Sequence, residues 1–242
     1  MTTASPSRAR RILEWFLRLY IIIAFPFLVV MVFVRIIMSP LYPQFEYSRP
    51  NFPADYYGFT VQERLTYAPY AIQYLLNGED ISFLGNLRFP DGTEMYNTRE
   101  LHHMRDVKAV TQYAFAAAVI GWLFALLIIY YFWRSNRPAL HSTLLNGSRL
   151  TIALILAIVI IAITSWDTFF TAFHGLFFAG GTWQFEYSDT LIRLFPEQFW
   201  YDASLIIGGA TLLVALVTMY LTLRSSSRSV LTPSQQDGTL TS

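Results

Sequence analysis

The stretch YAFAAAVIGWLFALLIIYYF, residues 113–132, contains no charged residue. The hydrocarbon core of a bilayer is about 30 Å thick, and a helix needs about 20 apolar residues to cross it. Three further stretches meet this requirement, at residues 17–38, 150–166 and 205–223. We therefore predict an α-helical integral membrane protein with four transmembrane helices, forming a single membrane domain over residues 1–242.

The acidic residues outside these stretches are concentrated in two loops. Arginines precede the first predicted span, lie between the second and third, and follow the fourth, whereas every acidic residue except Glu14 and Asp237 falls within residues 39–112 or 167–202. Basic residues favour the cytoplasmic side of membrane proteins. We therefore predict that both termini are cytoplasmic and that these two loops lie outside the cytoplasm. The polar tail, residues 225–242, is expected to be disordered.

The chain has no cysteine, which excludes disulfides, thiolate nucleophiles and thiolate metal sites. It also has no Gly-x-Ser-x-Gly elbow, no His-Glu-x-x-His zinc motif and no glycine pattern typical of nucleotide binding. We predict no cofactor and no nucleic-acid partner, and the sequence leaves the oligomeric state open. Any acyl transfer by this chain must work without an enzyme thiol.

The first outer loop is predicted to form part of a small mixed cap of helical and extended pieces. Residues 60–76 have helical spacing, with Thr60 as a possible cap, a stop at Asn77-Gly78, and Pro69 as a residue that should kink or break the helix. Residues 45–50 and 81–96 are expected to be extended and to form a small sheet over the site.

A second helix in this loop is predicted to start at a capping box. Asn97-Thr98-Arg99-Glu100 has the required pattern, and the helix should continue without a break into the second span. Helical spacing then places Glu100, His103 and Asp106 along one stripe, while His102 is rotated by about 100° and should be exposed.

Two of the four histidines are candidates for chemistry. His103 precedes Asp106 by three residues, so the carboxylate can lie beside the imidazole and orient it, although a structural hydrogen bond explains the spacing equally simply. His174 lies in the phenylalanine-rich second loop, where an unpartnered imidazole is costly to bury. His174 could belong to a functional site, or it could lie at the membrane interface with its ring directed to the lipid headgroups. If both loops fold over the same helix ends, the two histidines can converge.

Two segments resemble a known bacterial integral membrane family, which includes the lipoprotein intramolecular transacylase Lit. One runs from Glu100 to Lys108, and the other from Phe173 through Phe178, Trp183-Gln184-Phe185 and Ser188 to Trp200. The resemblance covers all four predicted spans and both outer loops. It implies a location in the bacterial cytoplasmic membrane with the active site at the extracytoplasmic face.

The resemblance also implies an activity and its residues. Members move an acyl chain from the diacylglyceryl group on a lipoprotein's N-terminal cysteine to the α-amine of that cysteine, which gives a lyso-form lipoprotein. The expected partners are thus the diacylglyceryl-modified lipoprotein N-terminus and membrane lipid. The family's two essential histidines correspond to His103 and His174. Supporting roles are expected for Asp106, Glu100 and Asp189, and contacts with the acyl chains for Phe170, Phe173, Phe177, Phe178 and Trp183.

Two other functions fit parts of the sequence. A metal-dependent membrane hydrolase could use His103, Asp106 and His174 as ligands, since two histidines and one carboxylate form a known ligand set. A non-enzymatic assembly or transport component could use outward-facing histidines to bind headgroups or a partner. Transporters place ionisable groups near the middle of the membrane, and the four predicted spans are nearly free of them.

Overall fold

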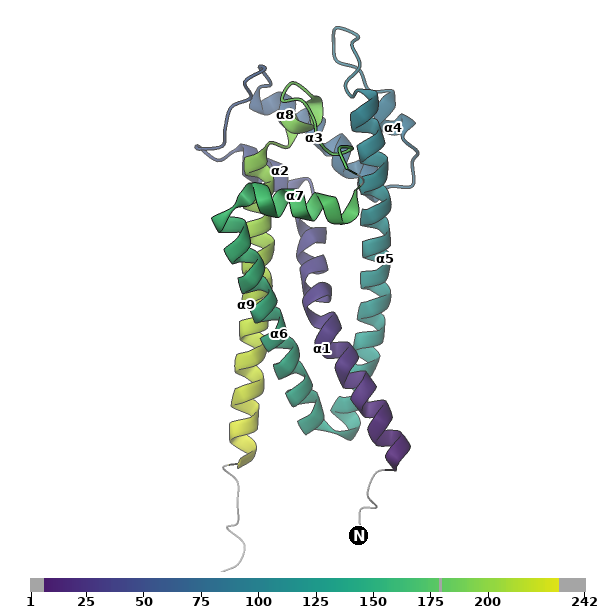
Figure 1. Cartoon of the computed structure of the whole chain (residues 1–242), viewed down its shortest axis with the longest axis vertical. Coiled ribbons are helices and arrows are strands. Elements are labelled where there is room, and N and C mark those ends of the chain that lie inside the picture. The colour runs from purple at the N-terminus through teal and green to yellow at the C-terminus, as the bar shows by residue number, and fades with distance from the viewer. Residues whose placement is uncertain (1–6, 179, 231–242) are drawn as a thin grey trace, which may run out of the picture. The chain divides into compact units, whose positions relative to one another are not determined.

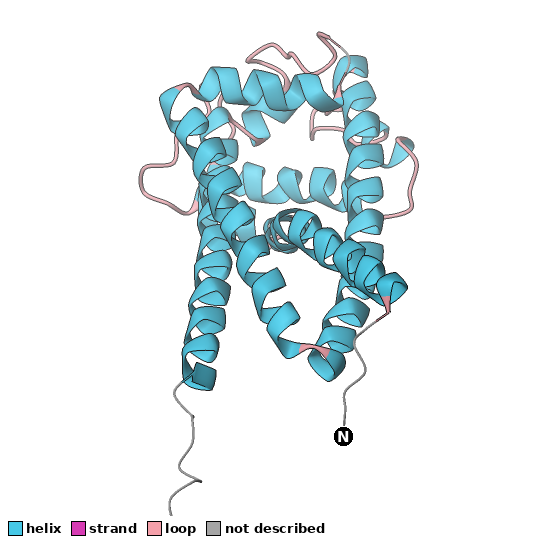
Figure 2. Cartoon of the chain, turned by 60° about the horizontal axis from the view of Figure 1, so that its bottom comes forward, coloured by secondary structure: helices cyan, strands magenta, loops and turns pink. Residues whose placement is uncertain are grey.

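The computed structural model describes residues 7–178 and 180–230, with side chains to residue 225. All regular secondary structure in this part of the chain is helical, as Figure 2 shows. The helices are α1 (Arg8–Ile37), α2 (Leu41–Tyr47), α3 (Val61–Leu76), α4 (Ser82–Gly85), α5 (Thr98–Ser135), α6 (Arg137–Thr164), α7 (Trp166–Phe177), α8 (Thr190–Leu194) and α9 (Glu197–Val230).

Four of the described helices are long and apolar enough to cross a membrane: α1, α5, α6 and α9. They coincide with the four predicted stretches, except that α1 ends at Ile37, one residue early, and α6 ends at Thr164, two residues early. The prediction of a four-span helical membrane protein is confirmed. Each helix extends beyond its apolar stretch; α5, for example, begins at Thr98, fifteen residues before Tyr113. Helix α9 continues to Val230, so residues 225–230 are helical where we expected disorder. Residues 231–242 of the expected tail lie outside the described part.

The chain divides into two compact units, one formed by residues 1–29, 121–155 and 211–242, the other by residues 30–120 and 156–210. In the first unit, α1 and α5 pack closely at Gly121. A Cβ atom added there would lie 2.9 Å from Cδ2 of Leu28, so a larger residue would force the Leu28 side chain or the helix to shift. The Tyr20 hydroxyl donates to the Gly121 carbonyl at 2.9 Å. Close helix packing of this kind is typical of membrane interiors, where small residues let backbones approach.

The second unit holds the outer loops, and its core is built from short helices. Buried residues of α2, α3, α4, α8 and the start of α9 form one apolar cluster, which includes Tyr47, Tyr74, Leu84, Leu194 and Phe199. Helix α7 follows α6 after Ser165 and lies crosswise to α5 in Figure 1. Unlike its neighbours, α7 contributes no buried residue to the core.

Helix α3 begins as predicted but is not broken at Pro69. The Thr60 hydroxyl accepts from the Glu63 amide at 3.1 Å, and the Glu63 carboxylate accepts from the Thr60 amide at 2.8 Å, which is a complete capping box. The helix passes Pro69 and ends at Leu76, with Asn77 as its C-cap. Proline removes one backbone hydrogen bond, and burial of the helix on both sides of Pro69 offsets this loss.

The prediction of extended pieces in the cap was wrong. Residues 45–47 belong to α2, and residues 82–85 form α4. The described part of residues 81–96 has a single isolated bridge, between Arg88 and Glu94, around a turn in which Gly92 has a φ of 87°. A lone pair of short strands is marginally stable in water, whereas short helices can bury one face against α3. The cap is therefore helical rather than mixed.

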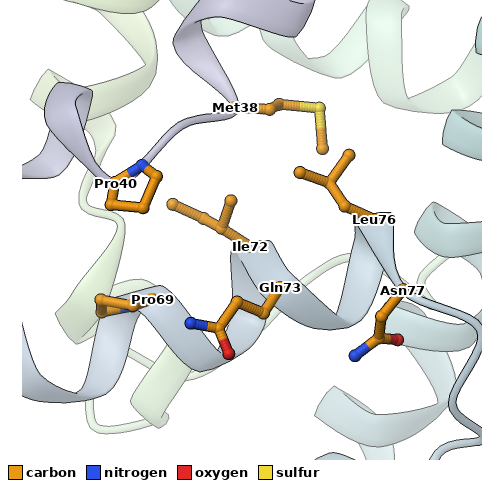
Figure 3. A pocket seen from close by; sticks show the side chains of 7 residues that line it. All are labelled: Met38, Pro40, Pro69, Ile72, Gln73, Leu76 and Asn77. Atoms are coloured by element: carbon orange, nitrogen blue, oxygen red, sulfur yellow. The ribbon is translucent and has the colours of Figure 1, made fainter.

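A shallow pocket of about 300 Å³ lies at the outer end of α1 (Figure 3). Met38 and Pro40 line one side, and Ile72, Gln73 and Leu76 of α3 line the other. Neither candidate histidine belongs to its lining, so the candidate site lies elsewhere in the second unit.

Candidate active site

The capping box at the start of α5 positions His103. The Asn97 amide donates to the Glu100 carboxylate at 2.8 Å, and the Asn97 side chain accepts from the Glu100 amide at 3.0 Å. This fixes the first turn of the helix, and His103 follows one turn later. Its side chain is buried, with 8% of the residue exposed. The edges of two aromatic rings cover it, those of Phe178 at 5.0 Å and Phe185 at 5.2 Å between ring centroids.

His174 is oriented by its own helix. Its Nδ1 lies 2.8 Å from the carbonyl oxygen of Phe170, one turn earlier in α7. A carbonyl only accepts hydrogen bonds, so Nδ1 carries the proton and Nε2 of the neutral ring keeps a free lone pair. Burial lowers the pKa of His174, although the hydrogen bond to Phe170 opposes this effect. The ring lies between Phe170 and Trp183, at centroid distances of 4.0 and 4.8 Å.

The two histidines converge, although they come from different loops. Their ring centroids are 6.4 Å apart and the rings are 24° from parallel. No hydrogen bond joins them in the described structure, and Nδ1 of His103 is buried with no hydrogen-bond partner there. At this separation, two imidazoles can address opposite sides of one reacting group, each within the roughly 3 Å that proton transfer requires.

Two carboxylates fasten the second loop to the start of α5. The Glu100 carboxylate accepts from the Leu191 amide at 2.7 Å. The Asp189 carboxylate accepts from the Asn97 side-chain amide and from Arg99, both at 2.8 Å. Both predicted supporting residues therefore lie at the junction between the loops, where neither touches a histidine ring directly.

Asp106 lies in a different place from the one expected. Its carboxylate is 3.6 Å from Nδ1 of the exposed His102, and no hydrogen bond joins it to His103 in the described structure. The side chain of His103 points into the aromatic cluster, while Asp106 is about a third exposed. The expected hydrogen bond between His103 and Asp106 is therefore not formed in the described structure, although the charge of Asp106 opposes the lowering of the His103 pKa by burial.

The aromatic residues expected to contact acyl chains fall into two groups. Phe170, Phe178 and Trp183 contact His174 and form the inner wall of the site. Phe173 and Phe177 are about half exposed, and Phe173 also contacts His174, at 5.7 Å between ring centroids. Phe185 covers His103 and was missed, although it lies in the Trp183-Gln184-Phe185 segment that carried the family resemblance.

The expected metal ligand set is not assembled in the described part of the chain. No group of three or more histidine and acidic side chains there is placed to hold an ion, and Asp106 lies beside His102 rather than between His103 and His174. The donors that do converge are two imidazoles in an aromatic surround. This arrangement supports proton transfer and the exclusion of water.

Fold and site together define a polytopic helical membrane protein with a histidine pair in a water-poor site and no thiol. The family model described as "Lipoprotein intramolecular transacylase Lit" matches residues 17–200 of the chain, about three quarters of its length. The chain belongs to this family. It is an acyltransferase, an intramolecular transacylase that acts on lipoproteins in the membrane.

Similar proteins agree with this assignment. An uncharacterized protein of Aquifex aeolicus is 29% identical over 205 residues, which cover 84% of this chain and 91% of that protein. The fold is similar to the membrane-integral lipoprotein intramolecular transacylase Lit of Bacillus cereus, with a TM-score of 0.76, 20% identity, and coverage of 91% of this chain and 99% of that one. Two structures of that protein with one histidine replaced, by arginine or by alanine, give TM-scores of 0.71 at 20% identity. These cover 92% of this chain, and 96% and 98% of the respective neighbour chains.

Proposed function

We propose that this chain moves an acyl chain from the S-diacylglyceryl group of a lipoprotein to the α-amine of its N-terminal cysteine. The observation that carries the proposal is the convergence of His103 and His174 within aromatic rings, on a chain without cysteine. The substrate brings its own nucleophile, so the enzyme has to position the amine, move protons and exclude water. Family membership supports the same reaction class.

His174 is the proposed general base. An α-amine has a pKa of about 7.7–8.0, so only about a tenth of it is neutral at pH 7. The free Nε2 lone pair of His174 suits proton removal as the amine attacks the ester carbonyl, because Nδ1 already donates to Phe170. The amide bond forms and the bond from the carbonyl carbon to the glyceryl oxygen breaks. The proton taken from the amine is returned to that oxygen.

His103 is the proposed partner on the oxygen side of the ester. Its unpartnered Nδ1 would gain a hydrogen-bond acceptor when a substrate oxygen replaces the covering ring edges. A donor there stabilises the tetrahedral oxyanion or protonates the leaving glyceryl oxygen, and in the second case the proton that His174 took from the amine restores the His103 N–H. Positioning contributes most of the rate, since holding amine and ester in a near-attack geometry supplies roughly 7–11 kcal/mol.

The proposed orientation puts this site at the extracytoplasmic face of the bacterial cytoplasmic membrane, with both termini inside. Four spans return the chain to its starting side, and the arginines flank the ends of the spans opposite the histidines. The expected partners are the diacylglyceryl-modified lipoprotein N-terminus and membrane lipid.

Mass spectrometry of lipoprotein N-terminal peptides tests the proposal. The parent chain, expressed in a host that makes only diacylglyceryl lipoproteins, should yield N-acyl monoacylglyceryl cysteine. His103→Ala and His174→Ala should each lose this product by at least about a hundredfold, the usual contribution of a general acid or base. His102→Ala is the matched control, because this exposed neighbour contacts neither ring. Unchanged diacylglyceryl cysteine with well-expressed parent would contradict the proposal.

A further inference from the structure

Glu100 stands at the N-terminal ends of two helices at once. One carboxylate oxygen accepts from the Asn97 amide at the start of α5, at 2.8 Å, and the other accepts from the Leu191 amide in the first turn of α8, at 2.7 Å. The residue is 1% exposed. Buried backbone amides at a helix start favour a negative partner, so this single carboxylate joins segments that are 91 residues apart in the chain.

The segment held by Glu100 also supplies the cover of His103. Phe185 lies six residues before Leu191, with its ring 5.2 Å from that of His103. Between them, Asp189 accepts from the Glu186 amide at 3.0 Å and from Arg99 at 2.8 Å, and the Arg99 guanidinium lies 5.8 Å from the Phe185 centroid. Hydrogen bonds at Leu191, Asp189 and Glu186 therefore hold the short segment that runs from the Glu100 carboxylate to Phe185.

The cover matters because two nucleophiles compete for the same ester. Attack by the α-amine forms an amide and releases the glyceryl hydroxyl. Attack by water at the same carbonyl forms a free fatty acid and releases the same hydroxyl, with the proton of the attacking water passing to the leaving oxygen. A base that activates the amine also activates water, so the outcome depends on how well the site excludes water.

We propose that Glu100 is a positioning residue that sets the ratio of transfer to hydrolysis by holding the Phe185 segment over His103. The inference rests on the proposed transacylase function. It extends that function from the transfer reaction to the competition between transfer and hydrolysis. Glu100 touches neither imidazole in the described structure, so it acts through the segment it holds.

The test uses the full-length chain in vesicles with a diacylglyceryl lipopeptide as probe. Free fatty acid and N-acyl lipopeptide are quantified from the same reaction. Glu100→Gln replaces one accepting carboxylate oxygen by an NH2 group that faces a backbone amide, so one buried hydrogen bond is lost. We expect the ratio of fatty acid to N-acyl product to rise roughly tenfold, which is the size expected for losing one charge-assisted buried hydrogen bond. Glu63→Gln is the matched control, because Glu63 caps α3 in the same way but holds no part of the second loop. It should leave the ratio unchanged.

Phe185→Leu supplies a second route that leaves the Glu100 carboxylate in place. It removes the ring edge from His103, so the ratio of fatty acid to N-acyl product should rise. This measurement remains possible if Glu100→Gln fails to fold. An unchanged ratio in Phe185→Leu, or a Glu100→Gln chain that slows both products equally, would overturn the inference while leaving the transacylase function intact. A parent chain that forms no N-acyl product would contradict the proposed function itself.

Discussion

At the scale of single residues, the two histidines differ in how they are held. His174 is oriented by a carbonyl in its own helix, so its tautomer does not depend on any other segment. His103 is held by the start of α5 and by aromatic cover from the second loop, and its buried nitrogen has no partner in the described structure. This asymmetry suits a pair in which one ring removes a proton and the other meets an oxygen of the substrate.

The direction of the His174 shift predicts the pH dependence. Desolvation favours the neutral ring, so the pKa is lowered and His174 remains a base below its ordinary value of 6.5. Above that region burial keeps His174 neutral, and the single-turnover rate should fall about tenfold per pH unit below about pH 7.7 as the substrate amine takes up its proton. Burial also raises the pKa of Glu100 to about 7, so the profile of the Glu100→Gln chain separates its titration from that of the amine. The fall should steepen to about a hundredfold per unit only below about pH 6.5, where His174 also becomes protonated. A steep limb that begins above pH 6.5 would contradict His174 as the base.

At the scale of helices, α7 is unlike the elements around it. It has no buried residue, and its Phe173, Leu176 and Phe177 are all about half exposed or more. It follows α6 directly after Ser165, at the end of an apolar span. Aromatic and aliphatic side chains in this position are typical of a helix that lies in the membrane interface. The same helix carries His174, which contacts Phe173.

Packing between α1 and α5 gives a prediction about stability. A Cβ atom at Gly121 would lie 2.9 Å from Cδ2 of Leu28 and 3.3 Å from the Tyr20 hydroxyl. Gly121→Ala should therefore destabilise the fold by about 1–3 kcal/mol through overpacking, which corresponds to roughly 2–4 °C in Tm for each kcal/mol. Thermal unfolding in detergent measures this change.

Gly209→Ala is the control for that measurement. Gly209 also lies in a long apolar helix, but a Cβ atom added there would meet nothing within 4 Å. Its Tm should stay the same or rise slightly, because alanine favours helix more than glycine does. Equal losses in both variants would show that the Gly121 contact does not limit stability.

At the scale of the whole molecule, four apolar helices and acidic residues concentrated in two loops define the topology to test. The chain has no native cysteine, so a maleimide can label only an introduced one. Labelling therefore shows on which side of the membrane that position lies. Tyr187→Cys, at a position that is 81% exposed in the second outer loop, should react with a membrane-impermeant maleimide in intact cells. Ser135→Cys, at the end of α5, should react only after the membrane is opened. The reverse pattern would contradict the proposed orientation.

Much of this protein could be predicted from local sequence, because the decisive signals act over short distances. A span needs only about 20 consecutive apolar residues. The cap at Thr60 and the capping box at Asn97 join residues three apart, and both form at the predicted positions. The two histidines were identified from residues adjacent to them in the chain.

The tertiary structure decided what depends on contacts between distant segments. It placed Asp106 beside His102, brought Phe185 onto His103, and used Glu100 to hold Leu191, a residue in the other loop. It also made helices of residues 45–47 and 82–85, which were expected to be extended, because short helices bury apolar faces that isolated strands leave in water. Helical periodicity predicts the direction in which a side chain leaves its helix. The partner that this side chain meets depends on which distant segment packs against that face of the helix.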